Sequence, residues 1–226
     1  MPARRLPVRP DLDQLRHQAK DLLRGIHAGD PSPLADLREF HPEQIGPADA
    51  QLADAQLVLA RSYEAASWPR LVQACELVDA IWRDDVGGVR ELVTKHPALM
   101  VEPTIIRTNS DWGPPMTYAA NLGRDGIITM LRQLGASDVA SALDRATLQG
   151  RIGTARMLHA MAGSPVPPAN SLGGPAYTLS ASGTELLLEL GARVRDDNGR
   201  PMAPGVYWIR THTPSHYSVN KVVVVR

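Results

Sequence analysis

Three small groups of residues in this chain have types and spacings that could support chemistry. Adjacent carboxylates at Asp84-Asp85 and at Asp196-Asp197 could divide the roles of general acid and general base. His212 and His216 would lie on one face of a helix and could share a metal ion. Each group also has a simpler interpretation. Pro214 interrupts any helix between the histidines, Asp84-Asp85 suits the N-terminus of the helical segment that follows it, and Asp196-Asp197 lies in a segment of turn composition.

The remaining reactive side chains and motifs give no further support for catalysis. Cys75 is the only cysteine, so an internal disulfide is excluded, and its place among apolar residues on one helical face indicates a buried core residue. The sequence contains neither a Gly-x-Ser-x-Gly nucleophile motif nor a Gly-x4-Gly-Lys-Ser/Thr phosphate loop. Gly173-Gly174-Pro175 follows no apparent strand and is expected to be a hinge before a helix. We therefore expect no catalytic residue, no cofactor and no metal site, and hence no enzyme.

The elements that would position these residues are short helices. Residues 112–136 predict two of them: Pro115 suits a first helical turn, Gly123 can end that helix in the left-handed conformation, and Asp125 can cap the next one. Apolar residues recur at helical spacing, in the first helix at Met116, Ala119 and Ala120 and in the second at Ile127, Ile128, Leu131 and Leu134. Helices of this length are marginal alone in water, so each needs a neighbour over its apolar face.

The pattern returns along the chain at an equal interval. Gly135, Gly163 and Gly191 each follow an apolar helical pattern, and both intervals between them are 28 residues. Equal spacing of matching helix ends is typical of a solenoid of repeated helix pairs. The other predicted pairs are a degenerate opening pair and two downstream pairs, at residues 71–82 with 85–95, 139–150 with 157–161, and 176–182 with 184–190.

These residues resemble the ankyrin repeat. Pro115-Met116 is similar to the Pro-Leu of that family, Ala119-Ala120 to its paired alanines, Gly123 to its inter-helix glycine, Ile127-Ile128 to its paired valines, Leu131 to a leucine of its second helix, and Gly135-Ala136 to its closing Gly-Ala. The usual Thr-Pro-Leu-His opening is replaced here by residues 114–117, Pro-Pro-Met-Thr. The 28-residue interval is shorter than the usual repeat of about 33 residues, which indicates short connecting loops.

We therefore expect an all-α fold, with an ankyrin-like helical repeat solenoid over residues 70–194. Residues 1–69 would form an N-terminal helical cap over the first repeat, because apolar residues share one face of a helix between Leu12 and Ile26. Residues 195–226 leave the repeat pattern, and strand-favouring residues occur at 206–209 and 222–225. The tail either folds back as a hairpin over Leu186, Leu187 and Leu190, or the array ends before it. We expect an irregular tail.

The charge distribution bears on possible partners. The formal net charge is zero, but residues 1–10 carry +3 and residues 193–226 carry +4, which leaves −7 between them. A mildly acidic array disfavours phosphate contacts, so we expect no nucleic-acid partner; Arg4, Arg5 and Arg9 are either solvated or, in the less favoured alternative, a nucleic-acid arm. No run approaches 18 apolar residues and no secretory apolar segment follows the arginines. We therefore expect no membrane span and a cytoplasmic location.

The resemblance implies a protein–protein interaction module, a scaffold with no catalysis of its own. Ankyrin-type proteins contact their partners through loop tips and the ends of the first helices. This implies partner-binding roles for Ser110, Asp111, Trp112, Asn121, Leu122, Leu148 and Gln149. An exposed Trp112 would be a hot spot, whereas a buried one would be part of the core. The alternative function is a regulatory fragment whose catalytic or effector part lies outside this chain.

Overall fold

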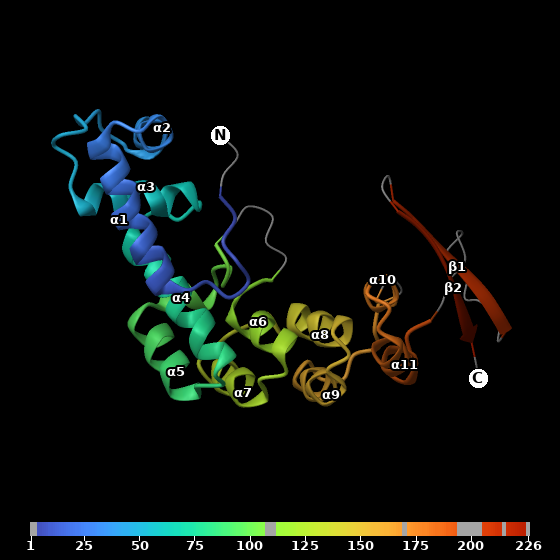
Figure 1. Cartoon of the computed structure of the whole chain (residues 1–226). Coiled ribbons are helices and arrows are strands. Elements are labelled where there is room, and N and C mark those ends of the chain that lie inside the picture. The colour runs from blue at the N-terminus through green and yellow to red at the C-terminus, as the bar shows by residue number, and fades with distance from the viewer. Residues whose placement is uncertain (1–3, 107–111, 169–170, 194–204, 214–215, 225–226) are drawn as a thin grey trace. The chain divides into compact units, whose positions relative to one another are not determined.

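A computed structural model of the chain describes residues 4–106, 112–168, 171–193, 205–213 and 216–224. The described elements are helical as far as residue 189, and a two-stranded hairpin follows them (Figure 1). The chain divides into two compact units, one formed by Met1–Pro115 with Thr129–Leu134 and the other by Met116–Ile128 with Gly135–Arg226. The predicted helical fold is thus confirmed up to residue 189, while the boundaries predicted at 69/70 and 194/195 stay predictions.

The first unit holds five complete α-helices and one short 3-10 helix among its described residues. Their bounds are α1 (Leu12–Ala28), α2 (Pro31–Phe40), α3 (Leu52–Ser62), α4 (Trp68–Trp82), α5 (Val86–Lys95) and η1 (Pro97–Met100). Side-chain oxygens of Asp11, Ser67 and Asp85 accept main-chain N–H groups in the first turns of α1, α4 and α5. These caps satisfy donors that a helix start otherwise leaves without partners, and Asp85 has the capping role that the sequence predicted for it.

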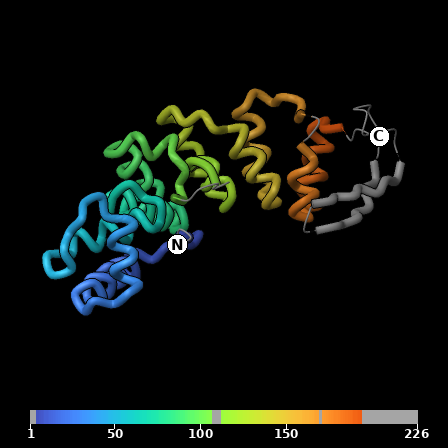
Figure 2. The backbone as a smooth tube through the Cα atoms, turned by 90° about the horizontal axis from the view of Figure 1, so that it is seen from above, coloured from blue at the N-terminus to red at the C-terminus, as the bar shows by residue number. Residues whose placement is uncertain are grey.

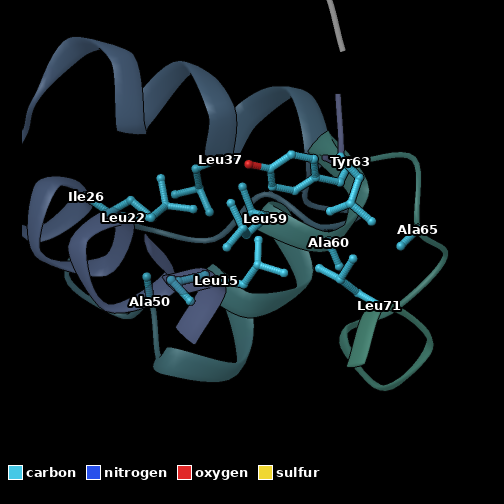
Figure 3. Packing of buried hydrophobic residues seen from close by; sticks show 14 of the residues in the cluster. Leu15, Leu22, Ile26, Leu37, Ala50, Leu59, Ala60, Tyr63, Ala65 and Leu71 are labelled. Carbon is cyan, nitrogen blue, oxygen red and sulfur yellow. The ribbon is translucent and has the colours of Figure 1, made fainter. Parts of the chain in front are cut away.

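The first three helices pack around a shared apolar core (Figure 3). Leu15, Leu22 and Ile26 of α1 are at most 7% exposed, as their helical spacing predicted. They pack in one cluster with Leu37 of α2 and Leu59 of α3. Full burial of each such side chain stabilises the fold by about 1.5–3 kcal/mol. The N-terminal segment therefore has its own core, and contacts of α1 and α3 with α4 join it to the next helix pair.

The segment ahead of α1 is fastened to the helices by two of its arginines. The main-chain N–H of Arg4 donates to the carbonyl of Ser62 at 2.8 Å, and its guanidinium pairs with Asp36 at 2.6 Å. Arg9 pairs with Asp79 of α4 at 2.9 Å. Neither arginine is simply solvated, because both side chains have carboxylate partners far along the chain, although Arg9 and Asp79 remain 53% and 44% exposed. The expected absence of a nucleic-acid partner stays a prediction.

The remaining described helices begin at Pro115. Their bounds are α6 (Pro115–Leu122), α7 (Asp125–Gln133), α8 (Val139–Leu148), α9 (Ile152–Met161), α10 (Gly173–Tyr177) and α11 (Ala181–Glu189). The two helices predicted over residues 112–136 are confirmed, although Asp125 lies inside α7 and its carboxylate accepts from Thr154 Oγ1 at 2.6 Å. In the second unit α8 packs against α9, α10 and α11, and these helices lie alongside one another in Figure 2.

The same turn joins the two helices of each described pair. One residue takes a positive φ, and the N–H of the next residue donates to the carbonyl five positions earlier, which is the Schellman arrangement. The residues with positive φ are Asp84, Gly123, Gly150 and Leu179, at 59°, 71°, 63° and 57°. The bonds run from Asp85 to Ala80, Arg124 to Ala119, Arg151 to Ala146 and Ser180 to Pro175, at 2.9, 3.0, 2.8 and 2.8 Å. The same turn joins α1 to α2, where Gly29 takes φ 79° and the N–H of Asp30 donates to the carbonyl of Gly25 at 2.9 Å. This helix–turn–helix unit therefore occurs at least five times among the described residues.

The ends of the second helices also follow the predicted interval. Gly135, Gly163 and Gly191 take φ values of 100°, 83° and 97°, so all three are left-handed helix ends as expected. The last pair lies earlier than predicted, because its first helix is α10 and its second is α11. Gly173-Gly174-Pro175 is therefore part of a helix and not a hinge before one. The predicted position was wrong because a leucine, Leu179, and not a glycine makes the left-handed turn.

The C-terminal segment forms an antiparallel hairpin of β1 (Gly205–Thr213) and β2 (His216–Val224). The expectation of an irregular tail is wrong for these residues, because β-branched and aromatic residues favour the strands that form. The register pairs His212 with Tyr217 and Thr213 with His216, so the two histidines lie in opposite strands and not on one helix. Among the described residues, no helix combines the length and the apolar character that crossing a bilayer requires.

Candidate functional site

The residues that the resemblance grouped as partner contacts differ in how far the structure exposes them. Ser110 and Asp111 lie outside the described residues. Trp112 is half-buried, so its exposure is intermediate between the buried core residue and the exposed contact residue that the sequence left open. Gln149 is exposed, and Leu122 is half-buried. The predicted contact roles of Leu122 and Gln149 stay predictions.

Helix α6 offers no open face. Every residue from Pro115 to Asn121 is buried, so this helix is covered all round, as a helix that is apolar on every side should be. Asn121 is 6% exposed, and its main-chain carbonyl accepts from Arg151 Nε at 3.4 Å. Asn121 is therefore enclosed, and its predicted place on an open contact surface is wrong for this structure. The sequence placed it there because α6 was assumed to keep one solvent face.

Leu148 occupies the equivalent position at the end of α8, and its backbone has an equivalent partner. The main-chain carbonyl of Leu148 accepts from Thr178 Oγ1 at 2.8 Å, as that of Asn121 accepts from Arg151 thirty residues downstream. The adjacent Thr147 carbonyl accepts from Ser180 Oγ at 3.1 Å. The carbonyls at the end of a first helix are thus bound by side chains of the next helix pair. This arrangement satisfies acceptors that a helix end otherwise leaves open.

A pocket of about 180 Å³ lies where α8 faces α10. Its walls combine apolar side chains with hydroxyl and carboxyl groups, and they comprise Asp144, Thr147, Leu148, Pro168, Ser171, Gly174 and Pro175. The Ser171 Oγ is buried and has no hydrogen-bond partner among the described residues. Partial burial raises the pKa of the Asp144 carboxyl above its ordinary value of 3.8, and Arg145 opposes that rise, although Asp144 as a whole is exposed. The pocket therefore offers polar groups able to bind a donor beside an apolar wall.

Two large side chains stand exposed at the end of α10. Tyr177 is 71% exposed and Leu179 is 73% exposed. Leu179 also has φ 57°, a conformation that costs a residue with a Cβ about 1–2 kcal/mol. We refer to the surface formed by Asp144, Leu148, Gln149, Ser171, Tyr177 and Leu179 as the α8–α10 face.

Sequence reasoning found only two members of the α8–α10 face, Leu148 and Gln149. A small residue recurs three positions after each left-handed turn residue, at Gly87, Gly126, Gly153 and Ser182. That spacing in the sequence could have placed the last turn at Leu179. With the turn at Leu179, Tyr177 would be placed beside the turn between α10 and α11, at the loop tips where ankyrin-type proteins contact their partners.

The described residues contain no cluster of three or more His, Cys, Asp or Glu side chains able to hold a metal ion. Cys75 lies on α4 and is 2% exposed, so the predicted core position is confirmed. Burial, together with the smaller effects of the negative charges of Glu76 and Asp11, raises the pKa of its thiol from 9.0 to about 12. The reactive thiolate is therefore scarce in the folded chain.

We predict that Cys75 of the folded chain resists alkylation by iodoacetamide at pH 8. With a pKa of about 12 the thiolate fraction is about one in ten thousand, whereas an unfolded cysteine ionises to about one part in ten. Labelling followed by mass spectrometry should be at least about a hundredfold slower in buffer than in 8 M urea. Equal rates in the two solvents would contradict the buried position.

The chain matches no known protein-family model and no curated protein sequence. Its function must therefore be argued from its own residues and their geometry.

Proposed function

We propose that this chain is an ankyrin-type helical-repeat protein that binds another protein through the α8–α10 face and has no catalysis of its own. The observation that carries the proposal is the helix–turn–helix unit with the same turn bond, which joins α1 to α2 and recurs in the four later helix pairs. Short helix pairs that cannot bury their apolar faces alone are typical of repeat arrays, and such arrays present extended binding surfaces.

Hydrogen bonds between successive helix pairs support the stacked arrangement. Asp125 of α7 accepts from Thr154 of α9 at 2.6 Å. The bonds from Arg151 to Asn121 and from Thr178 to Leu148 both end on the carbonyl two residues before a left-handed turn, and both donors lie at the turn of the next helix pair. In a linear array each unit contacts its immediate neighbours, and such contacts supply most of the stability.

The composition of the α8–α10 face favours a protein partner. Tyrosine is enriched at binding hot spots, and Tyr177 leaves most of its surface in water. The strained, exposed Leu179 supplies apolar area that a partner would cover. Asp144 and Gln149 add exposed polar groups to this face, and interfaces commonly combine an apolar centre with a polar rim.

The substitution Leu179→Gly tests this proposal without endangering the fold. Glycine adopts a positive φ freely, so the variant should keep its stability or gain up to about 1 kcal/mol, after allowance for the greater freedom of its unfolded chain. The same change, alone or with Tyr177→Ser, should weaken partner binding at least about tenfold. The partner would be isolated by affinity capture and purified, and its binding measured by calorimetry.

Val101→Ser is the matched control, because Val101 is 71% exposed but belongs to the other unit. It should leave partner binding unchanged. Undiminished binding by Leu179→Gly and Tyr177→Ser would exclude the α8–α10 face as the contact surface.

A further inference from the structure

The pocket where α8 faces α10 is too small for a typical small-molecule ligand. The two helices pack against each other (Figure 1), and the hollow between them has a volume of about 180 Å³. Pockets for small molecules and cofactors usually measure about 300–1,000 Å³. The walls approach closely at one point, where a Cβ added to Gly174 would lie 3.1 Å from Leu148 Cδ2. The size therefore suits one side chain of the protein partner proposed above.

Asp144 supplies the only charge among the described residues that line this pocket. Thr147 Oγ1 donates to the main-chain carbonyl of Asp144, whereas the carboxylate has no hydrogen-bond or ionic partner in the part of the chain that the structure describes. Burial raises the pKa of this carboxyl, and the smaller, opposite effect of Arg145 does not offset the rise. The negative charge has thus lost part of its hydration without compensation, and a cation would restore the lost interactions.

The other polar groups of the pocket do not oppose a cation. Ser171 Oγ is buried without a partner, but a hydroxyl accepts as well as donates, so it suits a ligand of either charge. The pocket also adjoins Thr147 and Leu148, the last residues of α8, and the dipole of a helix favours positive charge at its C-terminal end. On the other side α10 begins, but the dipoles of only five residues add up there. The electrostatics therefore favour a cationic occupant over an anionic one.

Among basic side chains, arginine fits this pocket best. Leu148, Pro168 and Pro175 offer apolar surface on which the methylene stem of a long basic side chain can lie. Both carboxylate oxygens of Asp144 are open, so a guanidinium can bind them through two parallel hydrogen bonds. A guanidinium is also less strongly hydrated than an ammonium, so it enters a partly dry pocket at a lower cost.

We infer that the pocket between α8 and α10 receives an arginine side chain of the protein partner, with its guanidinium on the carboxylate of Asp144. The inference rests on the proposed function, because it names the partner residue that the α8–α10 face would hold.

The test uses the full chain and the peptide acetyl-Gly-Gly-Arg-Gly-Gly-amide, with otherwise identical peptides that carry citrulline, lysine or glutamate in place of arginine. Citrulline keeps the shape of arginine without its charge. Amide shifts of Thr147 and Gly174 in proton–nitrogen NMR spectra would report binding at millimolar peptide. We expect saturable shifts with the arginine peptide, about three- to fivefold weaker affinity for the citrulline peptide, weaker affinity for the lysine peptide, and no saturation with the glutamate peptide. Absence of saturation with the arginine peptide, or equal affinity for the citrulline or lysine peptide, would overturn the assignment.

Two variants separate the charge of the pocket from its shape. Asp144→Asn keeps the shape of the side chain but removes its charge, and should reduce arginine-peptide affinity about three- to fivefold while citrulline-peptide affinity changes less. Gly174→Ala should weaken both peptides equally, because the added Cβ narrows the pocket beside Leu148. Glu185→Gln is the control, since Glu185 is an exposed residue of α11 that does not line the pocket, and its affinity should equal that of the unmodified chain. Circular dichroism would verify folding, and unchanged arginine-peptide affinity in a folded Asp144→Asn variant would refute the site.

Measurements with the purified partner distinguish this inference from the proposed function. Leu179→Gly and Tyr177→Ser alter residues outside the pocket and should leave arginine-peptide affinity unchanged. If Asp144→Asn leaves partner affinity unchanged while Leu179→Gly weakens it, the arginine assignment fails and the α8–α10 face remains the contact surface. If the arginine peptide binds as expected but neither Leu179→Gly nor Tyr177→Ser weakens the partner, the proposed function fails instead.

Discussion

Gly183→Ala is expected to detach α11 from α8, although alanine is the better helix former. A Cβ atom at Gly183 would lie 2.0 Å from the main-chain oxygen of Thr147 and 2.8 Å from Ser180 Oγ. Relief by a side-chain rotation is excluded, because the nearer atom belongs to the backbone. Moving α11 away would instead break the bond from Ser180 Oγ to the main-chain carbonyl of Thr147. Overpacking of this kind costs about 1–3 kcal/mol or more, which exceeds the helix-propensity gain of about 1 kcal/mol.

Hydrogen exchange would reveal the loss locally. The protection of amides in α11 should fall by at least about tenfold in Gly183→Ala, while that of α1 and α3 should not change. Gly153→Ala is the matched control: it lies near the start of α9, and an added Cβ would meet nothing within 4 Å. That change should raise stability by about 0.5–1 kcal/mol through helix propensity alone. Full α11 protection in Gly183→Ala would show that the two helices are not held at this distance.

Local signals in the sequence predicted most of the helix pairs. Gly123 and Gly135 predict helix ends, because few residues other than glycine adopt a positive φ without strain. Apolar spacing similarly marks α1 and α7, whose buried residues repeat at helical intervals. The position of the last helix pair was mispredicted because Leu179 adopts the left-handed conformation at an energetic cost. Amino-acid composition does not indicate where a non-glycine residue is strained in this way.

The candidate site was less predictable, because it depends on which helix faces remain open after packing. Asn121 and Leu148 occupy equivalent places, yet Asn121 is enclosed while Leu148 is half-buried beside a pocket. No local pattern distinguishes them, since enclosure of α6 is a property of the folded chain. The ion-pair partners of the basic N-terminus were equally unpredictable from local sequence. Three arginines suggested a solvated or nucleic-acid-binding segment, whereas Asp36 and Asp79, the partners of Arg4 and Arg9, lie 32 and 70 residues away.

Arg4→Ala is expected to be among the most destabilising single changes on the surface of the first unit. The carboxylate of Asp36 is 5% exposed and pairs with Arg4 at 2.6 Å. Removing the arginine leaves a buried carboxylate without an ionic partner among the described residues, a situation that costs about 3–5 kcal/mol when both groups are buried. Because Arg4 itself is 40% exposed, solvent screens the pair, and we expect a loss of about 2 kcal/mol.

Urea unfolding would measure this loss as a lower midpoint for the first unit, and a double-mutant cycle would assign it to the pair. If the pair is responsible, Asp36→Asn should be less harmful in the Arg4→Ala background than in the unmodified chain, with a coupling energy of about 1 kcal/mol or more, because an amide is easier to bury alone than a carboxylate. Arg5→Ala is the control, since Arg5 is the exposed neighbour on the same segment and should change stability by less than about 0.5 kcal/mol. Additive effects of the two changes would mean that Arg4 acts through its side-chain bond to Ser62 Oγ and not through the carboxylate.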